Sequence, residues 1–445
     1  MAMAEELPIA ESFAVDLQWP ANPGKGGNTL LDESLARFQI MVAGKSITAY
    51  QTEKGDKHSY LHVPTYYLVE WLAQNWWSFL YEPRKNDREV FEQDFRSRHW
   101  LGTPRNGFAL PDVMFSPAGE KIEIVARSAF LRFAQLNFIE ALTATVTTDS
   151  VRSEFSKFIE QVLAHLTENG VKDSAAHQHW DRVSKTTKEE EVYCRMVGSL
   201  GLSPYVSHPE IDRVFERVIG KITESMLTDL CDATNMGNFE QAAGVANGVS
   251  AALGSAKTIQ VKELLKVQRP VDSTPRAYEW GYQATDVARS ALGIAHDDPR
   301  GSAAFFERFQ FDPSAGMEEG KGSEAAALSL ISGAVEREDD NMRVALTGSN
   351  RAHRKFAAAR AAFLTWSQGK KSSRLVTTAR TRDQQASRAF AAELLAPAKF
   401  LKKKLGERTE VSPFTLDRIS EEMGIAPTVV HYQAKNHGYY IAEAA

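Results

Sequence analysis

The chain has 445 residues, of which 43% are hydrophobic and 24% charged, and its formal net charge is −5. This balance is that of an ordinary globular protein of two or three domains. Two cysteines, Cys194 and Cys231, exclude a disulfide framework, and no stretch approaches the roughly 20 apolar residues of a membrane helix. The amino terminus lacks a secretory pattern, so we expect a cytoplasmic protein with structural thiols.

Residues 1–150 are predicted to form an α+β domain. Short β-branched segments between residues 35 and 66 indicate strands, and a second hairpin is expected over 109–126. Between them, helical spacing of apolar residues predicts a helix over Tyr66–Leu80. The pair Trp76–Trp77 on this helix could stack on a ligand, but paired aromatic residues on a helix more often pack in the core, which is our interpretation.

Residues 151–265 are predicted to be helical. Apolar residues recur every three or four positions in EFSKFIEQVLAHL, and an amphipathic helix is expected over Ile211–Leu230. Two motifs in the chain up to residue 265, WLAQNWW at 71–77 and LGLSPY at 200–205, stand out without indicating an activity.

A third domain is predicted over residues 266–445. Pro275 is expected to start a helix, residues 311–324 to form an exposed loop, and the apolar runs 327–335 and 342–349 to form strands. Three further helices are expected at about 352–366, 383–395 and 414–423, with a basic polar connection over 367–382 between the first two. The whole chain is therefore expected to be α+β and predominantly helical.

Positive charge is concentrated between residues 351 and 408. This segment holds 15 Lys and Arg against 3 Asp and Glu, or +12, so the remaining 37 Lys and Arg against 54 Asp and Glu give −17. Such asymmetry permits a surface that faces a polyanion, although exposed helices also collect lysines as a solvated face.

Two helices in the last third carry a family pattern. Lys355-Phe356-Ala357-Ala358-Ala359-Arg360-Ala361-Ala362-Phe363-Leu364 corresponds to R-F-x-x-A-H-E-x-x-H, and the segment Gln384–Pro397, which contains FAAELLAP, corresponds to E-x-x-A-N-x-F-A-A-E-L-L-M-P. Over about residues 270–440 the chain thereby resembles the ImmA/IrrE family, zinc metallopeptidase-like proteins that control prophage and stress regulators. The resemblance implies a metallopeptidase-like domain with a helix-turn-helix-like tail at about 411–440. In this family the tail can bind nucleic acid or equally pack on the body of the domain, and packing is our interpretation.

The residues that would perform the chemistry differ from the family pattern. H-E-x-x-H places two zinc ligands on one helix face and supplies the general base between them. At these positions stand Arg360, Leu364 and Ala361, and Gln384 replaces the third, carboxylate ligand. A guanidinium, two hydrocarbon side chains and an amide do not make a zinc site. We therefore expect no metal, no cofactor and no catalytic residue, with Arg360 in internal hydrogen bonds or an ion pair.

Three functions remain open at this stage. The first is an inactive, regulatory or sensor protein that binds a companion protein in prophage control or anti-phage defence, in a cleft where strand addition can still hold a peptide. The second is nucleic-acid binding, with candidate contacts at Lys370, Lys371, Arg374, Arg380, Arg382, Lys402, Lys403, Lys404, Gln433 and Lys435. The third is an active zinc peptidase with a rearranged site. No membrane partner is expected.

Overall fold

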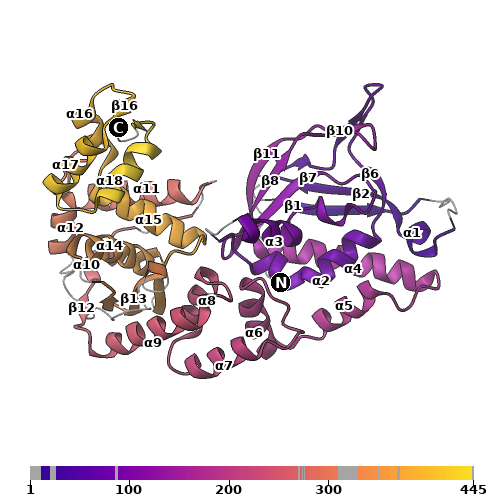
Figure 1. The fold of residues 1–445 in the computed structure, drawn as a ribbon, viewed down its shortest axis with the longest axis horizontal. Helices are drawn as coiled ribbons and strands as arrows, with labels where there is room; N and C mark the ends of the chain where they lie inside the picture. Colours follow the sequence, from indigo (N-terminus) through magenta and orange to yellow (C-terminus); the bar gives the residue numbers. More distant parts are fainter. Residues whose placement is uncertain are drawn as a thin grey trace. The chain divides into compact units, whose positions relative to one another are not determined.

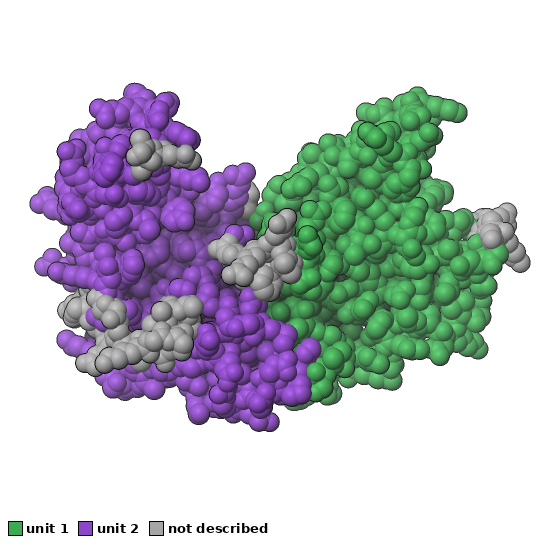
Figure 2. Space-filling model, viewed as in Figure 1, with its two compact units in different colours: residues 1–207 green, residues 208–445 purple. Residues whose placement is uncertain are grey.

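The computed structural model describes residues 12–20, 27–85, 89–268, 271–272, 274, 276–308, 329–348, 350–367 and 371–442. The chain divides into two compact units, Met1–Ser207 and His208–Ala445 (Figure 2). Each unit is described by itself. The three domains expected from the sequence, with boundaries at 150 and 265, stay a prediction.

The first unit contains small antiparallel sheets (Figure 1). One sheet joins β1 (Phe13–Gln18), β2 (Leu35–Val42), β3 (Lys45–Ser46) and β6 (Leu61–Pro64). Another has the order β11 (Leu142–Thr147), β8 (Lys121–Arg127) and β7 (Asp112–Pro117), and the third has the order β5 (Lys57–His58), β4 (Tyr50–Thr52), β10 (Leu136–Phe138) and β9 (Ala129–Leu131). The predicted second hairpin is confirmed as β7 and β8.

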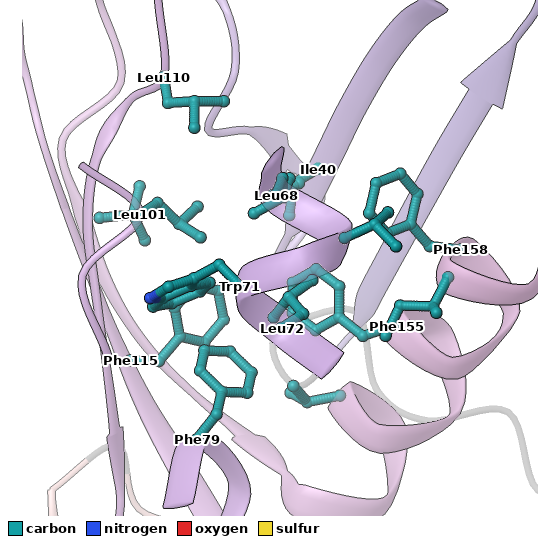
Figure 3. Packing of buried hydrophobic residues seen from close by; sticks show 14 of the residues in the cluster. Ile40, Leu68, Trp71, Leu72, Phe79, Leu101, Leu110, Phe115, Phe155 and Phe158 are labelled. Carbon is teal, nitrogen blue, oxygen red and sulfur yellow. The ribbon is translucent and has the colours of Figure 1, made fainter. Parts of the chain in front are cut away.

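Most residues of helix α2 (Tyr66–Tyr81) are buried, and Figure 3 shows part of the helix among buried hydrophobic side chains. Its residues Leu68, Trp71 and Leu72 are buried against residues of the sheets and of α4 (Thr148–Glu168), among them Phe115 and Phe155. The remaining helices of the unit are α1 (Thr29–Glu33), α3 (Glu89–His99), the 3-10 turn Thr103–Arg105, α5 (Ala175–Ser184) and α6 (Lys188–Ser199). Trp76 and Trp77 are both buried, so their predicted place in the core is confirmed.

The second unit is built on a four-stranded antiparallel sheet with the order β12 (Ile259–Gln260), β14 (Asn341–Leu346), β13 (Ile331–Glu338) and β15 (Lys371–Thr377). Its main helices are α8 (Glu224–Ala233), α9 (Phe239–Ser255), α11 (Ala277–Ala291), α14 (Arg351–Ser367) and α15 (Arg382–Leu395). Shorter elements are α7 (Pro209–Val218), α10 (Lys262–Lys266), α12 (Gly301–Arg308), α16 (Ala398–Leu405), β16 (Glu410–Val411), α17 (Pro413–Met423), α18 (Pro427–Asn436) and β17 (Tyr440–Ile441). Helices and small antiparallel sheets confirm the mixed α/β class, with about 51% helix.

Two elements differ from the sequence prediction. The single helix expected over Ile211–Leu230 is wrong, because the chain breaks between α7 and α8 at Gly220, whose φ of 79° interrupts the helix. The basic connection expected over 367–382 is also wrong, because it contains strand β15. Pro275 and the predicted loop at 311–324 lie outside the described residues. Among the helices that are described, none is long and apolar enough to cross a membrane.

Candidate functional site

The positions that match, in sequence, the zinc ligands and general base of the family pattern lie in the interior of the second unit. Arg360, Ala361 and Leu364 occupy one buried stretch of α14, and Gln384 is buried in the first turn of α15. Ala361 and Leu364 belong to the hydrophobic core, together with Phe363. The two polar side chains, Arg360 and Gln384, therefore need partners inside the protein, because a buried polar group without a hydrogen bond costs free energy.

Arg360 obtains its partners from β15 and α15. Its Nη2 donates to Gln384 Oε1 at 2.8 Å and to the carbonyl oxygen of Thr377, and its Nε donates to Ser387 Oγ at 3.1 Å. The guanidinium thus joins α14 to β15 and α15 through neutral acceptors. This agrees with the expectation that Arg360 makes internal hydrogen bonds.

Gln384 completes the same network. Its Oε1 also accepts from the backbone N–H of Thr377 at 3.1 Å, and its Nε2 donates to the carbonyl oxygen of Leu375 at 2.7 Å and to Asp229 Oδ1 at 3.3 Å. All four hydrogen-bonding positions of this amide are therefore occupied.

A buried ion-pair cluster lies beside this amide. Arg374 on β15 makes a two-pronged contact with Asp229 on α8, from Nε to Oδ2 at 2.8 Å and from Nη2 to Oδ1 at 2.6 Å. Its Nη2 also pairs with Asp383 Oδ2 on α15. The side chains of Asp229 and Arg374 are 3% and 14% exposed, so this pairing is screened from water much less than a surface ion pair.

Burial and neighbouring charges shift the pKa values of the three arginines in and around this cluster, Arg374, Arg360 and Arg388. Burial alone lowers the pKa of Arg374, but the two carboxylates raise it well above its ordinary value, so Arg374 stays charged. Burial lowers the pKa of Arg360 well below its ordinary value, and the nearby Arg388 lowers it further. Burial also lowers the pKa of Arg388, to about 10. The Arg374 guanidinium is therefore the cation that is firmly paired with carboxylates, whereas Arg360 is bound through neutral groups.

The network also occupies the outer edge of β15, which lies at the end of the sheet next to β13. The backbone N–H of Leu375 donates to Asp229 Oδ2 at 2.9 Å, and its carbonyl oxygen accepts from Gln384. The N–H of Thr377 donates to Gln384, and its carbonyl oxygen accepts from Arg360 and Arg388. An extended peptide would need these same backbone groups to add as a strand. At Leu375 and Thr377 that edge is closed by side chains.

The donor set does not fit a zinc ion. Zinc in proteins is bound by thiolate, imidazole or carboxylate groups, and catalytic sites use three of them with an open position. Around Arg360 the nearest carboxylates, Asp229 and Asp383, are both engaged by Arg374. Within the described parts of the chain, no group of three or more His, Cys, Asp or Glu side chains could hold a metal ion.

The candidate nucleic-acid contacts fall into three groups. The first group lies in the interior and cannot contact a nucleic acid: Arg374 pairs with Asp229, Arg382 pairs with Asp272, and Gln433 is fully buried. Exposed members are Lys371, Lys402, Lys403, Lys404 and Lys435, and the first four pair with Glu338, Glu407, Asp297 and Glu422, respectively. Arg380 is half-buried, and Lys370 lies outside the described residues.

The segment predicted as a helix-turn-helix-like tail contains the helices α17 and α18, with Gly424 in the left-handed conformation between them. Gln433 of α18 donates to Glu393 Oε2 at 2.7 Å and to the carbonyl oxygen of Ala396 at 3.1 Å. Tyr282 of α11 donates to the same Gln433 side chain at 3.2 Å. Gln433 therefore anchors the tail to α11 and α15, which favours the alternative that the tail packs on the body of the unit.

The residue that sequence reasoning missed is Asp229. It lies 145 residues before Arg374 in the chain, within a segment predicted only as part of an amphipathic helix. No local pattern marks it, because its role depends on which strand α8 covers. Asp383 and Gln384 could be placed near the site from their position at the start of a predicted helix.

Comparison with protein-family models, with curated protein sequences and with solved structures found no match to this chain. What the chain does is therefore inferred from its own residues and contacts.

Proposed function

We propose that this chain is a catalytically inactive, ImmA/IrrE-like pseudopeptidase that acts as a regulatory or partner-binding protein. One observation carries the proposal: the side chains at the positions of the zinc ligands, Arg360 and Gln384, bond to each other and to the backbone of β15. A group that is bonded in this way is not available to bind a metal or to activate water. The setting, prophage control or anti-phage defence, rests on the family resemblance alone.

The same network limits how a partner can bind. Strand addition next to Leu375 and Thr377 would require Asp229 and Gln384 to release their backbone partners. Each buried donor or acceptor left unpaired by that exchange costs about 1–3 kcal/mol unless the peptide replaces it. A companion protein therefore binds another surface, and the polar network keeps the helices of this unit in place.

Elemental analysis and a protease assay test the absence of catalysis together. The purified full chain is expected to contain no stoichiometric zinc and to leave an unfolded protein substrate intact, with or without added zinc. One tightly bound zinc per chain, together with hydrolysis that a chelator abolishes, would revive the third possibility, an active peptidase with a rearranged site.

A pull-down from the native host tests the binding role. The full chain should retain a specific companion protein, and the variant Gln384→Ala should retain it equally if the network is structural and folding is preserved. Loss of the partner in a folded Gln384→Ala variant would instead place the binding surface at the network. If neither form retains a companion protein, the regulatory proposal fails.

The nucleic-acid alternative is weakened by the burial of three of its candidate contacts. Its remaining support is the group of exposed lysines on β15, α16 and α18, four of which already have an acidic neighbour. Ion pairs of this kind reduce the positive field that would attract a phosphate backbone.

A further inference from the structure

The first unit contains a pocket of about 350 Å³ that brings together the two motifs without an assigned role. Helix α2 contributes Ala73–Asn75 and Trp77 of WLAQNWW and the next residue, Ser78. The second motif, LGLSPY, contributes its residues 201–205, and Val206 follows them. Ser97 and Arg98 of α3 and His179 and Arg182 of α5 complete the lining. Its volume lies at the lower end of the range for small-molecule sites, about 300–1,000 Å³.

Direct hydrogen bonds hold the two motifs together. Trp77 Nε1 donates to the Tyr205 hydroxyl at 2.8 Å, and Ser78 Oγ donates to the carbonyl oxygen of Leu202 at 3.4 Å. Tyr205 also bonds to Thr186 Oγ1 at 3.0 Å. These contacts fix the wall of the pocket before any ligand arrives, which reduces the entropic cost of binding.

Two glycines allow this close packing. A Cβ at Gly198 would lie 2.7 Å from the backbone of Trp77, and a Cβ at Gly201 would lie 2.6 Å from Glu82 Oε1 and 2.8 Å from Arg98 Nη2. Gly201 also has a φ of 80°, which side-chain-bearing residues rarely adopt. The shape of the pocket therefore depends on glycine at both positions.

The lining is cationic. His179 and Arg182 are three residues apart on α5, so they lie on the same helix face. Neither side chain makes a hydrogen bond or ion pair with the described residues, whereas Arg98 is neutralised by Glu82 through bonds of 2.7 and 2.8 Å. Among the described residues that line the pocket there is no Asp or Glu. Arg182 thus offers, at an open pocket, a guanidinium fork that no acidic side chain of the described residues pairs with.

We propose that this pocket binds a small phosphate monoester of about the size of a nucleoside monophosphate. Arg182 and His179 contact the phosphate, because a guanidinium fork and an imidazole together supply donors to several oxygens of one anion. Gln74 and Asn75 of α2 also line the pocket and bring amide groups for hydroxyl or ring-nitrogen partners of the rest of the molecule, although Asn75 Nδ2 already donates to the carbonyl oxygen of Trp71 at 2.9 Å. This inference concerns the first unit and does not depend on the proposed function of the second.

Calorimetric titration of the full chain tests it with two phosphate monoesters, AMP and ribose 5-phosphate, and with their uncharged counterparts adenosine and ribose. At least one phosphate should bind, and its uncharged counterpart should bind at least about tenfold more weakly, since hydrogen bonds to charged groups are the strong ones. Arg182→Ala should weaken phosphate binding by about tenfold or more. The matched control Lys172→Ala removes an exposed cation that does not line the pocket and should leave the affinity unchanged.

Three results would overturn the proposal. The first is no binding of either phosphate at millimolar concentration, and the second is equal affinity for phosphate in Arg182→Ala and in the unsubstituted chain. The third is binding of benzoate, used as a carboxylate probe, at least as tight as that of the phosphate that binds more tightly. Arg182 is exposed, so its replacement should not unfold the unit, and an unchanged melting temperature of the variant checks this.

Discussion

The replacement of Asp229 by alanine should loosen strand β15 and destabilise the second unit. Asp229 pairs with Arg374 through two bonds, accepts from the backbone N–H of Leu375, and accepts from Gln384. Removal of one partner from a buried ion pair commonly costs about 3–5 kcal/mol, and an unpaired buried N–H adds to that cost. Asp383 still pairs with Arg374 in the variant, so the expected loss lies toward the lower end, about 3 kcal/mol.

Hydrogen exchange is the suitable assay, because it reports on β15 locally even if the two units unfold separately. In the unsubstituted chain, the amides of Leu375 and Thr377 should be protected from exchange by Asp229 and Gln384. In Asp229→Ala, the peptide that covers 371–377 should exchange by about two orders of magnitude faster, which corresponds to the loss of about 3 kcal/mol. Urea unfolding should show a lower midpoint for the same variant.

The matched control is Glu338→Ala. Glu338, the last residue of β13, pairs with Lys371 on β15, but both side chains are exposed, at 69% and 74%. Exposed pairs of this kind contribute little, so exchange over 371–377 should not change. If Asp229→Ala exchanged and unfolded like the unsubstituted chain, the argument that α8 closes the edge of β15 would be refuted.

Three further predictions concern the core, the tail and the lysines. Phe390→Asp should lower the free energy of unfolding by several kcal/mol in urea, because Phe390 is fully buried against Phe363. Arg360→Ala should be milder, because the acceptors of Arg360 keep other partners. Equal urea midpoints for Phe390→Asp and the unsubstituted chain would contradict this prediction. Burial raises the pKa of Glu393 to about 7, against about 4.3 in the unfolded chain, so the stabilisation by its protonated form is lost as pH rises through about 7. Glu393→Gln should therefore remove this part of the pH dependence of the urea midpoint. If the midpoint changed with pH in the same way in the variant and in the unsubstituted chain, the prediction would be wrong. The chain should bind neither duplex DNA nor single-stranded RNA at low salt. Salt-sensitive binding that is lost when Lys402, Lys403 and Lys404 are replaced by glutamate would restore the nucleic-acid alternative.

The helices of the second unit could largely be predicted from sequence, because their signals are local. Apolar spacing and the FAAELLAP run place Phe390 in the core, where it is fully buried, and Gly424 marks the turn between α17 and α18. The break between α7 and α8 had a local signal in Gly220, but the apolar periodicity on both sides concealed it.

Strand β15 and Asp229 could not be predicted in the same way. The first half of β15 has the composition of a loop, with the residues Lys371, Ser372, Ser373 and Arg374. Its strand conformation depends on pairing with β13. Asp229 acquires its role only when α8 lies over that strand. Long-range contacts of this kind leave no periodic pattern in the sequence. The departure of Arg360 and Gln384 from the family pattern was therefore visible in the sequence, while the hydrogen-bond network that they form was not.

The closed edge of β15 also bears on self-association. A strand at the end of a sheet presents unpaired amides and carbonyls on which another chain can pair, and natural proteins protect such edges against aggregation. Here β15 ends in three buried residues, Leu375, Val376 and Thr377. Side chains of Asp229, Gln384 and Arg360 occupy the outer backbone groups of this part of the strand. These three side chains thus shield an adhesive edge, and variants that open it should aggregate at concentrations at which the unsubstituted chain stays dispersed.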